Sequence, residues 1–159
     1  TQGVGATVGN DYPSLLSELI GKPIINMGVS GNTSKDGLTR VEEVIAQKPK
    51  IVLVLFGGND FLRRVPMSET FRNIDDIVVK LQNAGAIIVL LGVKGGILTD
   101  EYKKYFESIA EARGALYVPD VLEDIFRERE LMADGIHPNN AGYQKIAEKV
   151  FPIIQKALQ

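Results

Sequence analysis

The sequence predicts an α/β protein, a single-domain three-layer α/β/α sandwich in which helices cover both faces of a mostly parallel sheet. Short apolar runs typical of strands alternate with longer segments whose apolar residues recur at helical spacing. Two of the runs, 51–56 and 86–91, are apolar at every position. Such runs are typical of parallel strands that are buried on both faces of a sheet.

The first part of the chain is expected to hold two helices and two strands, near 12–20, 34–48, 23–27 and 51–56 respectively. Asp11 is a preferred helix N-cap, and Gly21 is typical of the residue that follows a helix. Pro49 limits the second helix because the residue before a proline disfavours helical backbone. The first helix has no strand before it, so a strand is expected upstream of Thr1.

The second part continues the alternation, with strands expected over 86–91 and 115–118 and helices near 68–84, 99–113 and 140–156. Thr99 and Asp100 are the expected caps of the middle helix. The segment 121–132 is irregular and helix-prone. Asn139 or Asn140 begins the last helix, whose expected buried stripe is Tyr143, Ile146, Ala147, Val150, Ile153 and Ile154.

Composition predicts one domain over residues 1–159, because the chain is long enough for one core and has no linker or repeat. A formal charge of −2 gives no electrostatic reason to expect a nucleic-acid partner. The sequence has no basic run and no apolar stretch of bilayer length, so stable membrane insertion is not expected. The absence of cysteine excludes a disulfide, a thiol nucleophile and a thiolate metal site.

Four polar or Gly-rich segments are expected at the edge where open parallel sheets bind ligands, namely 28–33, 57–60, 93–98 and 134–139. The last contains His137, the only histidine, and imidazole suits proton transfer near neutral pH. Asp134, three residues earlier, is placed to hold the ring in one tautomer. These residues are therefore candidates for acid–base catalysis.

Each segment also has an ordinary structural explanation. His137 suits an exposed position near a helix start, and Gly57 with Gly58 suits a turn in which Asn59 or Asp60 caps the next helix. The convergence of the segments favours a site instead. Glycines let backbone N–H groups approach a ligand, and an asparagine amide can donate to a developing oxyanion.

Taken in order, these segments resemble the sequence blocks of the SGNH hydrolases, also called the GDSL esterase/lipase family. Residues 1–5 are similar to those that follow the first block, 26–34 to the second, 57–60 to the third and 134–139 to the fifth. The resemblance covers essentially the whole chain and points to the bacterial thioesterase I/lysophospholipase/arylesterase branch. It implies a mostly parallel, flavodoxin-like sheet.

The resemblance implies a role for individual residues. It places the catalytic acid and base at Asp134 and His137, and the oxyanion-hole donors at Gly31 and Asn59. The family's nucleophile is the serine of the first block, which is expected just before Thr1 together with a central strand.

Ser30 is the alternative nucleophile within the chain. It lies in a strand–turn–helix context, but Asn32 stands where the Gly-x-Ser-x-Gly elbow requires its second glycine. Ser30 is therefore expected to shape the turn that presents the Gly31 N–H.

The resemblance implies a carboxylic ester hydrolase that cleaves esters or thioesters through an acyl-enzyme, with no metal or organic cofactor. The substrates implied are short- to medium-chain acyl, aryl or lysophospholipid esters, and a sugar acetyl ester also stays open. The side chains expected to contact this small molecule are Val93, Ile97, Leu98 and Phe61, for which ordinary packing is an equal alternative. A bacterial monomer or small homo-oligomer is expected, and the sequence does not decide between periplasmic, secreted and cytoplasmic locations.

Two other functions fit parts of the sequence. The first is a non-catalytic module of the same family that binds a partner or ligand. The second is a flavodoxin-like domain in which 3–9 and 31–34 hold a phosphate or nucleotide at a helix N-terminus. Neither segment matches a Walker or dinucleotide fingerprint, so hydrolysis is the preferred expectation.

Overall fold

The chain forms two compact units in the computed structural model, which describes residues 2–94 and 101–159. The first unit consists of Thr1–Ser30 and Val121–Gln159, so it is built from both ends of the sequence. The second unit is the continuous segment Gly31–Asp120. Contacts within the first unit therefore join residues far apart in sequence.

The second unit contains a parallel three-stranded sheet with the order β1-β2-β3. The strands are β1 (Ile51–Val54), β2 (Ile87–Leu91) and β3 (Leu116–Val118). In the register, Ile51 lies opposite Ile87, and Val89 lies opposite Leu116. The α/β class and the parallel strand direction expected from the sequence are confirmed.

Burial differs between the strands. The four residues from Ile88 to Leu91 are at most 1% exposed, whereas Ile51, Val52 and Leu53 are only partly buried. The expectation that 51–56 forms a strand buried on both faces is therefore wrong for Ile51, Val52 and Leu53. The reason is position, because β2 is the central strand and β1 lies at an edge of the sheet.

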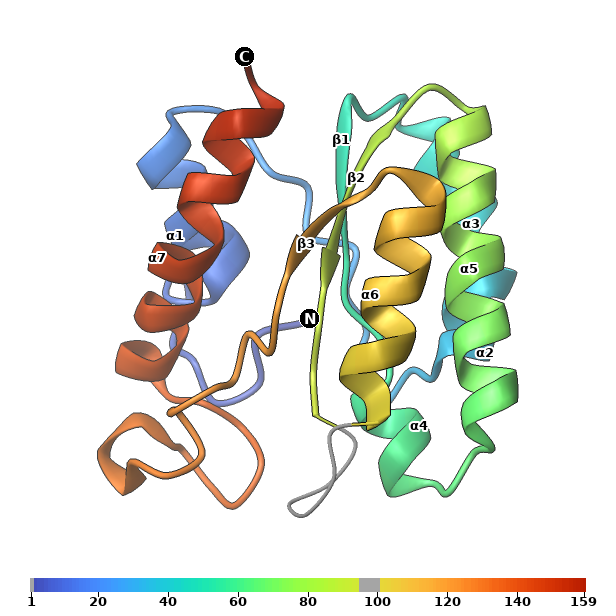
Figure 1. Cartoon of the computed structure of the whole chain (residues 1–159). Coiled ribbons are helices and arrows are strands. Elements are labelled where there is room, and N and C mark those ends of the chain that lie inside the picture. Colours follow the sequence, from blue (N-terminus) through green and yellow to red (C-terminus); the bar gives the residue numbers. More distant parts are fainter. Residues whose placement is uncertain (1, 95–100) are drawn as a thin grey trace. The chain divides into compact units, whose positions relative to one another are not determined.

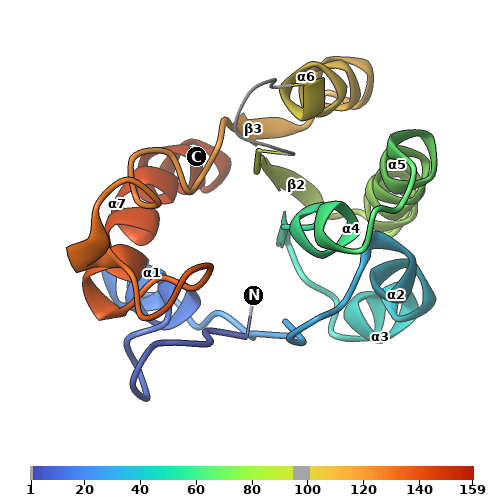
Figure 2. The ribbon, with the colours of Figure 1, turned by 90° about the horizontal axis from the view of Figure 1, so that it is seen from below.

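The helices of the second unit gather on one side of its sheet (Figures 1 and 2). They are α2 (Ser34–Thr39), α3 (Val41–Ala46), α5 (Met67–Asn83) and α6 (Glu101–Arg113), and the short α4 (Gly58–Leu62) follows β1. Helix α5 connects β1 to β2, and α6 connects β2 to β3, as parallel neighbours require. An aromatic cluster joins α5 to α6, with the Phe71 ring centroid 4.9 Å from that of Tyr102 and 5.0 Å from that of Phe106.

The single helix expected over 34–48 divides at Arg40, whose φ of −106° and ψ of 3° lie outside the helical region. Its start is confirmed, because Thr33 caps α2 and exchanges hydrogen bonds with Asp36 in a capping box. The expected caps Thr99 and Asp100 lie outside the described residues.

In the first unit, α1 (Tyr12–Ile20) packs beside α7 (Asn140–Ala157), drawn in blue and red in Figure 1. The predicted caps are confirmed. The Asp11 side chain accepts from the Ser14 N–H at 3.2 Å, and Gly21 has a left-handed φ of 63°. Asn139 caps α7 by accepting from the Gly142 N–H at 3.1 Å.

The buried stripe of α7 is confirmed except at Ile153, which is only partly buried. The irregular stretch before this helix contains one short 3-10 helix, Arg129–Leu131. Over residues 2–94 and 101–159, no helix combines the length and the apolar character needed to cross a bilayer.

The strand expected over 23–27 is not formed. Local hydrogen bonding accounts for the difference, because the Asn26 side chain accepts from the Gly28 N–H at 2.9 Å. Such Asn–backbone bonds give the chain an alternative to a strand ladder. Hydrophobicity alone therefore overestimates the strand content here.

Leu16 and Leu19 on α1 provide a matched test of this packing, since Leu16 is 0% exposed and Leu19 is 41% exposed. We expect Leu16→Ala to lower the free energy of unfolding by about 2–5 kcal/mol, because it leaves a cavity between α1 and its neighbours. Leu19→Ala is expected to cost much less. Urea denaturation followed by circular dichroism measures both, and equal costs would contradict this packing.

Candidate active site

A tight loop before α7 carries the predicted acid and base. The loop is closed by the Ala133 N–H, which donates to the His137 carbonyl at 2.8 Å, and by a bridge between Met132 and Pro138. Asn139 follows directly and fastens the loop to the 3-10 helix, because its side-chain amide donates to the Glu130 carbonyl at 2.7 Å. The backbone of the loop is therefore fixed on both sides of His137.

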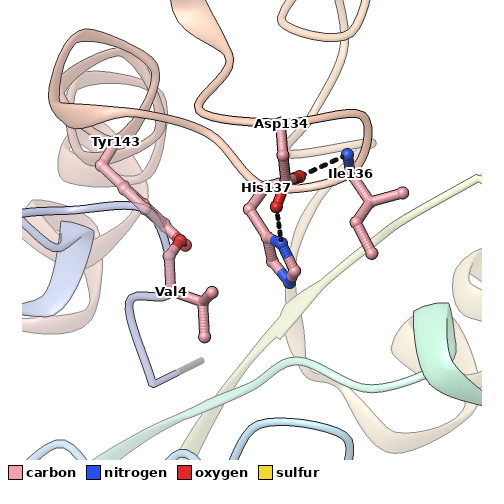
Figure 3. A network of polar contacts seen from close by, with 5 residues as sticks. All are labelled: Val4, Asp134, Ile136, His137 and Tyr143. Atoms are coloured by element: carbon pink, nitrogen blue, oxygen red, sulfur yellow. Dashed lines mark hydrogen bonds and ion pairs between the residues drawn. The ribbon is translucent and has the colours of Figure 1, made fainter.

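The structure brings Asp134 and His137 together (Figure 3). The His137 Nδ1 lies 2.8 Å from Asp134 Oδ2, while Oδ1 accepts from the backbone N–H groups of Ile136 and His137 at 2.8 and 2.7 Å. The His137 hydrogen bond and these two N–H groups lower the pKa of Asp134 from 3.8 to about 2. The carboxylate is thus ionised at neutral pH and accepts the Nδ1 proton, which leaves Nε2 as the basic atom of the imidazole.

The segment after Thr1 packs against this loop within the first unit. Gly5 has a φ of +92°, and a Cβ there would lie 2.9 Å from the Ala133 Cβ and 3.4 Å from the His137 Cβ. Only glycine fits this approach without displacing the loop.

Two hydrogen-bonded contacts fasten the same segment to α7. Thr7 and Asn140 exchange two hydrogen bonds of 2.9 Å, from the Thr7 N–H to Asn140 Oδ1 and from Asn140 Nδ2 to Thr7 Oγ1. The Tyr143 hydroxyl donates to the Val4 carbonyl at 2.8 Å, as Figure 3 places these residues. Burial, followed by the charges of Asp11 and Asp134, raises the pKa of Tyr143 to about 12, so the phenol remains a donor.

The oxyanion-hole candidates Gly31 and Asn59 both lie in the second unit, where Asn32 joins them. Gly31 has a left-handed φ of +79°, and Asn59 lies in the first turn of α4. Asn59 Nδ2 donates to the Asn32 carbonyl at 2.9 Å, while Arg40 holds the Asn32 side chain at 3.0 Å. A primary amide has two N–H groups, so this bond orients the Asn59 side chain and leaves one donor for a ligand.

Asp60 is a polar residue whose role the sequence analysis did not find. Neither Asn59 nor Asp60 caps α4, because the helix begins at Gly58 and Gly57 is its N-cap. Asp60 is instead 0% exposed and accepts from Ser34. A carboxylate directly after a Gly-Gly-Asn turn was the available signal, but its burial depends on residues distant in sequence.

The expected substrate contacts fall into different environments. Phe61 is 44% exposed, and its ring forms a T-shaped contact with Tyr102, with ring centroids 6.2 Å apart. Val93 is buried, with its Cγ2 3.4 Å from the position of a Cβ on Gly57. Ile97 and Leu98 lie outside the described residues. Contact of these side chains with substrate stays a prediction.

Ser30, the alternative nucleophile, is exposed, and its N–H donates to the Gln2 side chain at 2.9 Å. This bond uses the backbone of Ser30, so the role of the Ser30 hydroxyl stays a prediction. In the ranges 2–94 and 101–159, no three His, Asp or Glu side chains gather as a candidate metal site.

The chain matches the GDSL-like lipase/acylhydrolase family over residues 1–145. It belongs to this family. The match extends across both compact units, from the segment beside the His137 loop through Gly31 and Asn59 to α7.

Bacterial relatives place this GDSL hydrolase among the enzymes that hydrolyse carboxylic esters or thioesters. Esterase TesA of Pseudomonas aeruginosa is 30% identical, over 85% of this chain and 71% of TesA. The arylesterase of Vibrio mimicus is 28% identical, over 95% of this chain and 82% of that protein. The thioesterase 1/protease 1/lysophospholipase L1 of Escherichia coli is 28% identical, over 79% of this chain and 64% of its own length.

Solved structures give the same fold for the GDSL hydrolase. The psychrotrophic esterase EstA from a Pseudoalteromonas species, inhibited by monoethylphosphonate, aligns with a TM-score of 0.87 and 27% identity, over 98% of this chain and 92% of EstA. The acetylxylan esterase Axe2 of Geobacillus stearothermophilus aligns with a TM-score of 0.79 and 26% identity, over 91% of this chain and 80% of Axe2. Axe2 was solved as catalytic mutants in which a histidine or a serine is replaced by alanine.

In the folded GDSL hydrolase, we expect Asp134 to titrate with a pKa of about 2, below its ordinary value of 3.8. Folding lowers the pKa of Asp134. The hydrogen bonds of its carboxylate therefore stabilise the fold at pH values above 3.8, and this stabilisation is lost as the pH falls toward 2. His137→Ala removes the largest cause of the shift and should raise the Asp134 pKa toward 3.8. NMR of the carboxyl carbons during an acid titration measures it.

Asp36 is the matched control for this titration. Its pKa is lowered by the backbone N–H and hydroxyl of Thr33, without His137. It should keep its pKa in His137→Ala, and an unchanged Asp134 pKa in that variant would contradict the described pair.

Gly5→Ala is expected to reduce both stability and ester hydrolysis, because its methyl group displaces the His137 loop. Gly9→Ala is the control, since Gly9 has a similar φ of +82° but nothing within 4 Å of an added Cβ. Backbone strain is then common to both variants, and we expect Gly5→Ala to cost about 1–3 kcal/mol more. Urea unfolding and ester turnover measure the difference, and equal effects would exclude a role for this contact.

Proposed function

We propose that this GDSL hydrolase cleaves carboxylic esters or thioesters with His137 as general base and Asp134 as its orienting acid. Gly31 and Asn59 stabilise the oxyanion. The nucleophile in this proposal is the serine of the family's first sequence block, upstream of Thr1. The main support is the Asp134–His137 pair, whose 2.8 Å contact fixes the imidazole tautomer with Nε2 free to accept a proton.

In the proposed reaction, the serine hydroxyl attacks the carbonyl carbon while His137 Nε2 takes its proton. The Gly31 N–H and the Asn59 amide donate to the carbonyl oxygen as it becomes negative. The tetrahedral intermediate then expels the alcohol or thiol, which receives the proton from His137. Water, activated by the same imidazole, hydrolyses the acyl-enzyme to release the carboxylic acid and restore the serine.

The proposed substrates are short- to medium-chain acyl, aryl or lysophospholipid esters and acyl thioesters. The names of the esterase, arylesterase and thioesterase relatives support these classes. The half-exposed ring of Phe61, two residues after Asn59, is an apolar surface suited to an acyl or aryl group. A sugar acetyl ester is a further candidate, because Axe2 is an acetylxylan esterase.

We also propose that residues 1–159 act as one hydrolase domain. The proposed acid–base pair belongs to the first unit and the proposed oxyanion donors to the second. One family match covers both. Neither unit alone holds all the groups that the reaction needs.

The test is p-nitrophenyl ester hydrolysis by the full-length protein and two variants. His137→Ala is expected to lower kcat by about a thousandfold or more, because it removes the general base. Ser30→Ala is expected to retain most of the activity, since Ser30 supports a turn in this proposal. Initial rates at several substrate concentrations separate kcat from KM.

Each alternative gives a different result in this assay. Loss of turnover in a folded Ser30→Ala variant would move the nucleophile to Ser30. A wild-type protein with no turnover on any acyl ester or thioester would instead indicate a non-catalytic binding module. Circular dichroism of each variant distinguishes lost chemistry from lost folding.

A further inference from the structure

The second unit contains a fully buried carboxylate outside the proposed reaction chemistry. Asp60 is 0% exposed, and both of its oxygens accept from the Ser34 N–H, at 3.1 and 2.9 Å. The Ser34 hydroxyl donates to Asp60 Oδ1 at 2.6 Å, and Thr70 Oγ1 lies 3.4 Å from the same oxygen. Most of the partners of Asp60 are therefore concentrated on one residue.

Ser34 itself is held in place by its surroundings. It is 0% exposed, and its hydroxyl accepts from Asn73 Nδ2 at 3.2 Å. Thr70 and Asn73 lie one turn apart on α5, so this helix contacts both Asp60 and Ser34. A buried polar group that lacks hydrogen-bond partners is strongly unfavourable, so Asp60 fixes the arrangement of its donors.

The position of this contact along the chain is informative. Asp60 directly follows Asn59, and Ser34 comes three residues after Gly31. The contact therefore joins the two segments that carry the proposed oxyanion donors. A second link runs beside it, because Asn59 Nδ2 donates to the Asn32 carbonyl at 2.9 Å. Together, the two links set the orientation of the Asn59 amide relative to the Gly31 turn.

We propose that Asp60 is a positioning residue for the oxyanion hole and acts through Asn59. The inference rests on the proposed function, in which Asn59 donates to the developing oxyanion. A donor of this kind acts in the transition state and contributes little to substrate binding. Displacing it by a fraction of an ångström therefore lowers kcat and leaves KM nearly unchanged.

Asp60→Asn tests the proposal with little change in side-chain volume. The amide retains one acceptor oxygen but directs an NH2 group at Ser34, whose N–H and hydroxyl both need an acceptor. We expect kcat for a p-nitrophenyl ester to fall by about tenfold to a hundredfold, as for a damaged oxyanion hole. KM is expected to change little. A wild-type kcat in folded Asp60→Asn would overturn the proposal.

A double-mutant cycle with Asn59→Ala tests whether Asp60 acts through Asn59. In the Asn59→Ala background the amide is absent, so Asp60→Asn is expected to cause little further loss of kcat. If the loss of kcat in the double variant equals the product of the losses in the two single variants, Asp60 has a general structural effect and the proposal is overturned. Val78→Ala is the control for destabilisation, because Val78 is buried on α5 eight residues beyond Thr70. It should lower the melting temperature and leave kcat unchanged.

If Asp60→Asn does not fold, Ser34→Ala tests the proposal instead. It removes the 2.6 Å hydroxyl contact but keeps the carboxylate and its backbone donor. A lower kcat at unchanged KM supports the proposal, and an unchanged kcat overturns it. The wild-type rate is measured first, because a wild-type protein without turnover contradicts the proposed function itself rather than the role of Asp60.

Discussion

Carboxylates that accept several hydrogen bonds fix both candidate halves of the catalytic apparatus. Asp134 uses one oxygen for two backbone N–H groups of its own loop and the other for the His137 ring. The same ion therefore shapes the loop and selects the tautomer. Asp60 is buried, and it joins the segment after Gly31 to the segment after Asn59 by accepting from Ser34. Burial makes each missing partner of Asp60 costly, whereas water can replace partners of the exposed Asp134.

Local signals in the sequence were sufficient for most of the fold. Asp11, Gly21 and Asn139 mark helix ends correctly because capping depends on residues within one turn. The continuous apolar run 86–91 correctly indicates a buried strand. The strand predicted over 23–27 is absent. A strand requires a hydrogen-bonded partner strand, and the Asn26 side chain instead accepts a local hydrogen bond from the backbone. The edge position of β1 was also unpredictable, since the order of strands is not encoded locally.

The candidate site was predictable where its residues are close in sequence. Asp134 and His137 are three residues apart, and their contact follows from one loop. The supporting contacts were missed because they are long-range. Thr7 and Asn140 are 133 residues apart, and Asp60 meets Ser34 across 26 residues. Tyr143 was expected only as part of a buried stripe, and its hydroxyl bond to Val4 depends on how the two chain ends meet.

The origin of the first unit from both ends of the sequence has a consequence for biosynthesis. The sheet-containing segment Gly31–Asp120 is continuous, so it can begin to fold while later residues are still being translated. Helix α1 must wait, because the surface on which it packs belongs to α7, which is synthesised after the whole of the second unit. A polypeptide that stops before α7 lacks the helix against which α1 packs. The contacts of Thr7 with Asn140 and of Val4 with Tyr143 therefore form only after α7 has been synthesised.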